Sequence, residues 1–149
     1  MQQSASPTPS KLSLWIGLTR PKTLFSGLSS VLVAIFYAAS LGAIDVLRTL
    51  LLVVVAVAAQ IASNIANDLI DHRKGADTDE RKGPLRPLSR GLISEREVRL
   101  ALYLSLAVLL TSGLWLIALS SWWLLLVGLA VVLGVFAYSG GPYPLSYHG

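Results

Sequence analysis

A short acidic segment contains the residue types best suited to chemistry in this sequence. It reads Asn67-Asp68-Leu69-Ile70-Asp71. Asn67, Asp68 and Asp71 supply hard oxygen ligands, and two carboxylates one helical turn apart repel each other. A divalent cation relieves this repulsion, and Mg²⁺ prefers one or two protein carboxylates together with retained waters and phosphate oxygens. Basic residues downstream can hold the remaining phosphate charge, so the segment predicts a Mg²⁺-diphosphate site.

The same charges also fit an ordinary solvated loop of mixed charge beside the end of a helix. Seven of the eight acidic residues lie between positions 68 and 97, and eight basic residues lie between 68 and 99. Asn and Asp also favour turns for local reasons. The charge pattern alone leaves both interpretations open.

Polar residues upstream of this segment favour the functional interpretation. At about 100° per residue, positions 60, 64, 67 and 71 of a helix fall within an arc of roughly 60°. The arc and its flanks carry Gln60, Ser63, Asn64, Asn67, Asp68 and Asp71. Amides and carboxylates that face lipid are costly. We therefore expect this polar stripe to face the interior of a helix bundle or a watery cavity.

The elements that position this stripe are membrane helices. Apolar residues make up 54% of the 149 residues and charged residues 13%, with a mean hydropathy of +0.65. This composition argues against a disordered chain and an ordinary cytosolic domain. The absence of cysteine excludes disulfides, a thiol nucleophile and Cys-ligated metal sites. The net charge of +4 fits cytoplasmic loops of a membrane protein and does not require nucleic acid as a partner.

Uncharged stretches locate the helices. Between Lys22 and Asp45 lie 22 uncharged residues, and between Arg48 and Asp68 lie 19 more. A spanning helix needs about 20 residues. A later apolar stretch is too long for one span, and the two serines and two tryptophans at 120–123 mark its break. The sequence predicts an all-α, polytopic membrane protein with helices at about 23–43, 48–67, 98–117 and 122–138.

The remaining segments complete the expected organisation. Residues 1–10 are expected to form a disordered tail, 11–149 a membrane domain, and the region around Trp15 a short interfacial segment. Three basic residues precede the first span and eight lie in or next to the loop 68–97, whereas the connection near Arg48 carries one. Both chain ends and the loop are therefore expected on the cytoplasmic side, in a prokaryotic plasma membrane or its equivalent.

Several motifs together resemble a known family. Asn67-Asp68-x-x-Asp71, with Asp77, Arg81 and Arg86-Pro87-Leu88-x-x-Gly91 after it, is similar to the first aspartate-rich motif of the UbiA superfamily of intramembrane prenyltransferases. Arg20-Pro21-Lys22-Thr23 resembles the R-P-x-T entry of the same family. Lys74-Gly75-Ala76-Asp77-Thr78 and the tail from Tyr138 to Gly149 are similar to the branch that prenylates 1,4-dihydroxy-2-naphthoate.

The resemblance implies a reaction and a larger fold. The enzyme would transfer a polyprenyl group from its diphosphate to an aromatic acceptor, here 1,4-dihydroxy-2-naphthoate, in menaquinone or phylloquinone synthesis, with Mg²⁺ as cofactor. The fold would be a bundle of about nine helices with a second aspartate-rich motif, which this sequence does not contain. The resemblance thus implies the N-terminal half of an enzyme, which needs a second half-chain or another copy as partner.

The resemblance also implies roles for individual residues. Catalytic roles fall to Asp68 and Asp71, and the implied metal ligands are Asn67, Asp68, Asp71 and Asp77. Gly75 stands where much of the superfamily has its third aspartate. The implied substrate-binding residues are Arg20, Asn64, Lys74, Arg81, Arg86, Tyr138, Tyr143 and Tyr147.

Each of these roles has a structural alternative. The basic residues also fit membrane topology, and the tyrosines also fit an aromatic belt at the membrane interface. Asn64 also fits an interhelical hydrogen bond. For the whole chain, the alternatives are a non-enzymatic or inactive membrane partner and a small transporter that uses the polar stripe.

Overall fold

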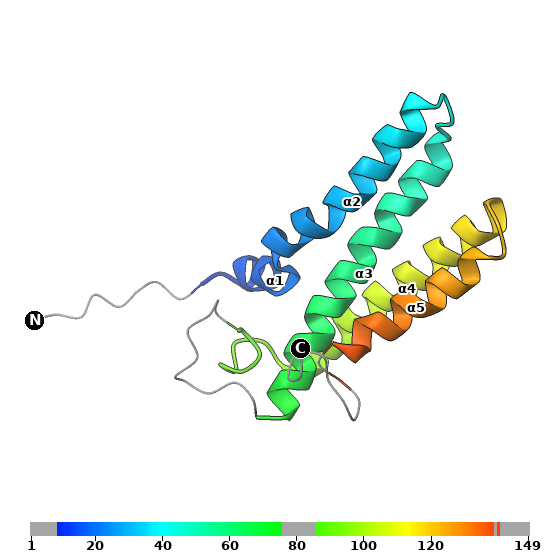
Figure 1. Ribbon diagram of the computed structural model, residues 1–149. Helices are drawn as coiled ribbons and strands as arrows, with labels where there is room; N and C mark the ends of the chain where they lie inside the picture. Colours follow the sequence, from blue (N-terminus) through cyan, green and yellow to red (C-terminus); the bar gives the residue numbers. More distant parts are fainter. Residues whose placement is uncertain (1–8, 76–85, 139, 141–149) are drawn as a thin grey trace, which may run out of the picture.

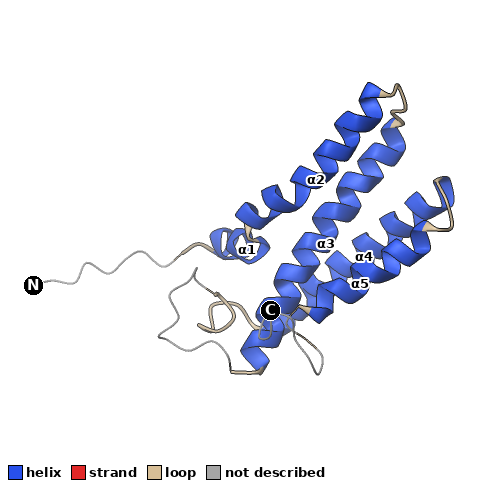
Figure 2. Cartoon of the chain, viewed as in Figure 1, coloured by secondary structure: helices blue, strands red, loops and turns tan. Residues whose placement is uncertain are grey.

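The computed structural model describes residues 9–75, 86–138 and 140, and this part of the chain is helical without strands (Figures 1 and 2). Its helices are α1 (Lys11–Thr19), α2 (Pro21–Ser40), α3 (Val46–Arg73), α4 (Glu95–Leu119) and α5 (Leu124–Ala137). Three helical stretches are long and apolar enough to cross a membrane: α1 with α2, α3, and α4, while α5 is a shorter apolar helix. The prediction of an all-α membrane protein is confirmed.

Helix α3 is the centre of the fold because it contacts every other helix of the described chain. Figure 1 shows α2 and α3 as one helical hairpin and α4 and α5 as a second one beside it. Small side chains at Ala58, Ala62 and Ala66 are buried along α3. Small residues let neighbouring helix backbones approach closely, so this composition suits a helix that is surrounded by others.

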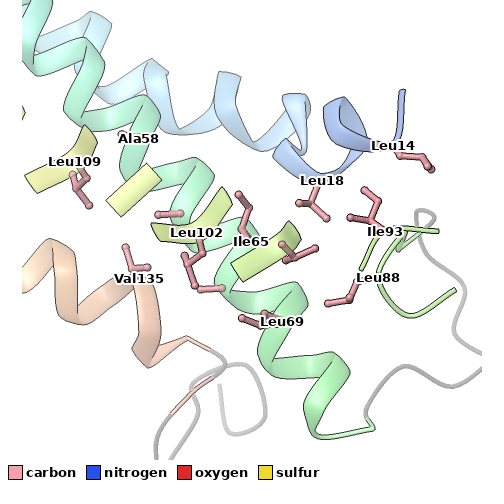
Figure 3. Packing of buried hydrophobic residues seen from close by; sticks show 13 residues of the cluster. Leu14, Leu18, Ala58, Ile65, Leu69, Leu88, Ile93, Leu102, Leu109 and Val135 are labelled. Atoms are coloured by element: carbon pink, nitrogen blue, oxygen red, sulfur yellow. The ribbon is translucent and has the colours of Figure 1, made fainter. Parts of the chain in front are cut away.

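The buried apolar cluster lies around the second half of α3 (Figure 3). Leu14 and Leu18 of α1 pack into it from one side, and Leu88 and Ile93 of the segment before α4 join them. Helix α2, by contrast, has no buried residue. Its exposed apolar surface suits contact with lipid, whereas the cluster fixes α1 and the loop residues against the polar stripe of α3.

Helix α3 continues past the end that the sequence predicted. The prediction ended this helix at 67 and began a loop at 68, but the structure keeps the chain helical as far as Arg73. Asp68 and Asp71 both have arginine partners, so their charges do not force the chain out of the helix. Gly75, with a φ of 64°, then turns the chain away.

The other helix bounds also differ from the prediction by a few residues. Helix α4 begins at Glu95, three residues before the expected start, because Ser94 and Glu97 form a reciprocal capping box. Helix α5 covers Leu124–Ala137, against an expected 122–138. Of the expected tail, residues 1–8 lie outside the described part, and Ser10 caps the N-terminus of α1.

A single residue separates α1 from α2. Arg20 has a φ of 51°, in the left-handed region, and Pro21 occupies the first position of α2. Proline suits the first turn of a helix because its missing N–H would have no partner there. The joint breaks a helical stretch of 30 residues, Lys11–Ser40. It turns α1 away from the axis of α2 so that α1 lies beside the second half of α3 (Figure 1), and it makes a helix of the expected interfacial segment around Trp15.

Candidate functional site

The second half of α3 carries a buried polar stripe. Asn64, Asn67, Asp68 and Asp71 are between 3% and 7% exposed. Gln60 and Ser63, one turn nearer the middle of α3, are partly buried. The stripe faces the protein interior, where the sequence pattern places it. A buried carboxylate is costly unless it is paired, so the surroundings of Asp68 and Asp71 decide what the stripe can do.

Two arginines from different parts of the chain meet the two carboxylates. The Nη2 of Arg20, at the α1–α2 joint, donates to Oδ1 of Asp68. The Nη1 of Arg86 donates to Oδ2 of Asp71 at 2.8 Å, and its Nε lies 3.8 Å from Oδ1 of Asp68. Arg86 therefore bridges both carboxylates. The sequence placed these four residues in one site, and the structure brings them together.

The carboxylates and guanidinium groups of this cluster differ in exposure. The side chains of Asp68 and Asp71 are 4% and 10% exposed, whereas those of Arg20 and Arg86 are 27% and 16% exposed. The carboxylates thus form the buried floor of the cluster, and the guanidinium groups lie nearer its surface. Guanidinium groups match the geometry of phosphate oxygens, so this arrangement suits an anion that is held over a carboxylate floor.

Asn67 provides an unsatisfied polar atom in the same stripe. Within the described part of the chain, its buried Oδ1 has no hydrogen-bond partner. A buried carbonyl oxygen without a partner costs free energy unless a ligand or water satisfies it. Together with Asp68 and Asp71 it forms a set of hard oxygen donors, which fits Mg²⁺. The described residues contain no cluster of three acidic or other classical metal ligands, and Asp77 lies outside them.

Asn64 contacts the α1–α2 joint. Its Nδ2 donates to the backbone oxygen of Thr19 at 2.8 Å and to Oγ1 of Thr23 at 2.9 Å. Its Oδ1 accepts from Nε2 of Gln60 at 3.5 Å. The amide group of Asn64 is therefore engaged with the segment that carries Arg20. The sequence predicted a substrate contact for Asn64, and that role stays a prediction.

Of the six other predicted site residues, two belong to the described part of the chain. Lys74, just after α3, is exposed. Tyr138, just after α5, is 51% exposed. Asp77, Arg81, Tyr143 and Tyr147 lie outside the described residues. The roles predicted for all six stay predictions.

The chain after α5 returns to the carboxylate end of α3. A Cβ placed on Gly140 would lie 3.3 Å from Cδ1 of Ile70, the residue before Asp71. It would also lie 2.6 Å from the backbone oxygen of Phe136, so a larger residue at this position requires the chain to shift. Gly140 therefore approaches α3 closely, beside Asp71.

Thr19 and Thr23 are site residues that the sequence reasoning missed. Both accept a hydrogen bond from Asn64, and Thr23 belongs to the Arg20-Pro21-Lys22-Thr23 segment. The Arg-Pro pair signals a helix start, which could have placed Thr23 in a first turn. No local signal indicates that this turn lies against Asn64, which follows 41 positions later.

Comparisons with known proteins identify a family for this chain. Residues 27–149 match the UbiA prenyltransferase family. The chain is 34% identical to the 1,4-dihydroxy-2-naphthoate octaprenyltransferase of Escherichia coli, over 94% of this chain and 47% of that protein. Its identity to the Mycobacterium tuberculosis protein of the same name is 38%, over 91% of this chain and 46% of that protein.

The matched region covers most of this chain and only part of its relatives. The Bacillus subtilis protein of the same name is 35% identical over 90% of this chain and 43% of its own length. The chain thus spans about half the length of the curated relatives it matches. No solved structure matches the chain significantly. With its apolar helices and the family match over residues 27–149, this chain is an integral membrane protein that belongs to the UbiA prenyltransferase family.

Proposed function

We propose that this chain carries the diphosphate-binding half-site of an enzyme that transfers a polyprenyl group to an aromatic acceptor. The observation that supports it most is the buried cluster in which Arg20 and Arg86 cover Asp68 and Asp71. In this cluster Arg86 reaches both carboxylates, and Oδ1 of Asn67 beside them stays unsatisfied among the described residues. An unsatisfied buried oxygen next to paired charges supports a site that is completed by a ligand.

The acidic and the basic residues have different proposed roles. Asp68, Asp71 and Oδ1 of Asn67 would hold Mg²⁺, with Asp77 as a further proposed ligand. Arg20 and Arg86 would bind the diphosphate oxygens, aided by Lys74 and Arg81. When bound, Mg²⁺ supplies electrostatic stabilisation of the negative charge that develops on the departing diphosphate. The arginines start from carboxylate partners and exchange them for phosphate oxygens.

The acceptor is proposed from the relatives. The similar proteins of Escherichia coli and Mycobacterium tuberculosis are both named for 1,4-dihydroxy-2-naphthoate and an octaprenyl group. We propose the same acceptor here, with a polyprenyl diphosphate as donor and Tyr138, Tyr143 and Tyr147 near the ring. We also propose that the loop 68–97 and both chain ends face the cytoplasm, and that a second half-chain or another copy completes the site.

Binding of the diphosphate tests the half-site directly. The 149-residue chain in detergent micelles is titrated with a radiolabelled polyprenyl diphosphate, with Mg²⁺ and with a chelator. Binding should require Mg²⁺ and should be lost in Asp68→Asn and Asp71→Asn. Glu95→Gln is the matched control because it removes the same charge from an exposed pair with Arg73. Equal binding in all three variants would refute the assignment of the carboxylates.

Transfer tests the reaction itself. Membranes that contain the chain receive 1,4-dihydroxy-2-naphthoate, the labelled donor and Mg²⁺, with and without the co-expressed C-terminal half of a related octaprenyltransferase. Prenylated naphthoate should form with the second half, or without it if another copy completes the site. Correct insertion with diphosphate binding but no transfer in either case would favour a non-enzymatic partner protein.

A further inference from the structure

The α1–α2 joint is the one place where the described backbone adopts an unfavourable conformation. Among the described residues, Arg20 is the non-glycine residue with a positive φ, at 51°. A side chain with a Cβ disfavours this region because it crowds the following carbonyl oxygen. Such a conformation persists only where the surroundings hold it, and it often lies at functional sites. The side chain of this same residue reaches Asp68.

Hydrogen bonds hold the backbone on both sides of Arg20. The Nδ2 group of Asn64 donates to the carbonyl oxygen of Thr19, just before Arg20, at 2.8 Å. It also donates to Oγ1 of Thr23 at 2.9 Å, and this hydroxyl in turn donates to the carbonyl oxygen of Arg20 at 2.9 Å. The two carbonyl groups that flank the left-handed turn are therefore both bound, directly or through Thr23, to one amide.

One face of α3 binds both the backbone around Arg20, through Asn64, and the side chain of Arg20, through Asp68. Asn64 lies one helical turn before Asp68, so their side chains project from one face. Asn64 is 3% exposed, and its Nδ2 group makes two hydrogen bonds to the joint. An amide used in this way has no remaining donor for a diphosphate. Its contribution to the site therefore passes through the segment that it holds.

We infer that Asn64 is a positioning residue that keeps Arg20 in its left-handed turn, with Thr23 as its relay. This inference rests on the proposed function for the role of Arg20 but describes a different property. Without the Asn64 bonds, Arg20 can leave the left-handed region for the extended conformation that a residue before proline prefers, and the angle between α1 and α2 changes. The guanidinium of Arg20 then moves away from Asp68 and is no longer in position to bind the diphosphate.

Spin-label distances test the joint without any ligand. The chain contains no cysteine, so Ile16→Cys and Phe36→Cys, at exposed positions of α1 and α2, give two unique labels. In a continuous helix these positions lie about 30 Å apart along the axis. The starting chain should give a shorter distance than that. Asn64→Leu and Thr23→Val should shift or broaden this distance, whereas Thr23→Ser, which keeps the hydroxyl, should leave it unchanged.

Binding of Mg²⁺-pyrophosphate tests the consequence for the site. Asn64→Leu should weaken binding by about tenfold or more, the loss expected for a bond to a charged group. In an Arg20→Gln background it should cause no further loss, because it acts through Arg20. Ser112→Ala is the control. It removes a buried hydroxyl that donates to the carbonyl oxygen of Val108 in its own helix. It should change neither the spin-label distance nor the binding of Mg²⁺-pyrophosphate.

The outcomes separate the two proposals. If the starting chain does not bind Mg²⁺-pyrophosphate, the proposed function fails while the spin-label distances still test the joint. An unchanged distance in both Asn64→Leu and Thr23→Val would overturn the inference. Additive losses of Asn64→Leu and Arg20→Gln would also overturn it and would indicate a direct contact between Asn64 and the diphosphate. Thr23→Val supplies the distance measurement if Asn64→Leu does not fold.

Discussion

The ion pair between Arg86 and Asp71 should contribute more to stability than a shorter pair elsewhere in the chain. Arg86 and Asp71 approach to 2.8 Å with side chains 16% and 10% exposed. Arg73 and Glu95 approach to 2.6 Å, but their side chains are 52% and 36% exposed. Distance and burial thus favour opposite pairs. The comparison shows which of them controls the coupling free energy.

Burial should dominate this comparison. Unit charges about 4 Å apart interact by about 4 kcal/mol at an effective dielectric constant of about 20, and by about 1 kcal/mol in water. Exposed pairs typically measure about 0.2–1 kcal/mol because solvent screens them. We therefore expect the coupling free energy of Arg73 with Glu95 to be the smaller of the two. For Arg86 with Asp71 we expect about 2–4 kcal/mol, since removing one partner leaves a buried charge.

Two double-mutant cycles measure these coupling energies. One cycle combines Arg86→Gln with Asp71→Asn, and the other combines Arg73→Gln with Glu95→Gln. The free energy of unfolding is followed by circular dichroism in detergent micelles. Raising the ionic strength from about 0.1 M to about 1 M shortens the Debye length from about 10 Å to about 3 Å. The coupling of the exposed pair should vanish under this change and that of the buried pair should persist.

Equal coupling energies in the two cycles would refute the reasoning. So would a larger value for the exposed pair, because distance would then outweigh burial. A loss of the Arg86–Asp71 coupling at high salt would indicate that solvent reaches the carboxylate floor freely. That result would contradict the 10% exposure of the Asp71 side chain.

Two further changes test how the helices are built and packed. Ser94→Ala removes the capping box with Glu97 and should lower the free energy of unfolding by about 1 kcal/mol, measured by thermal unfolding; no change would contradict the capping role. A Cβ on Gly27 would lie 2.9 Å from Oε1 and 3.7 Å from Cγ of Gln60. The amide end of Gln60 can move away, but a full leucine side chain would also press on the rest of Gln60, so Gly27→Leu should cost about 1–3 kcal/mol through overpacking of α2 against α3. Gly134→Leu is its control, because a Cβ there meets nothing within 4 Å, and equal costs would argue against close packing.

Hydropathy and helical period were enough to predict the main helices and the buried stripe. The uncharged stretches set the number of apolar helices, and the spacing of Asn64, Asn67 and Asp71 set their common face. These are local properties, which a single sequence reports well. The helix ends were less accurate. Arg86 lies 15 positions after Asp71, and its pairing lets α3 continue through the acidic segment.

The joint at Arg20 could not be predicted from local pattern. The Arg-Pro pair fits the start of a helix, but it does not say that Arg20 adopts a left-handed conformation. That conformation depends on Asn64, 45 positions after the Thr19 carbonyl to which it donates. Contacts of this separation arise from packing of whole helices. The sequence could therefore place Arg20 in the site but could not explain how it is held there.

The order of the two arginines along the chain has a consequence for membrane insertion. Arg20 precedes α3, so it has already been synthesised when Asp68 enters the membrane region, and it can neutralise that carboxylate at once. The pair between Asp71 and Arg86 forms only after Arg86, 15 residues later in the chain, has been synthesised. Asp68, which lies farther from the end of α3, thus has a cation available first, and Asp71 meets Arg86 afterwards. This order would reduce the number of unpaired charges on α3 as it enters the membrane, where each is costly.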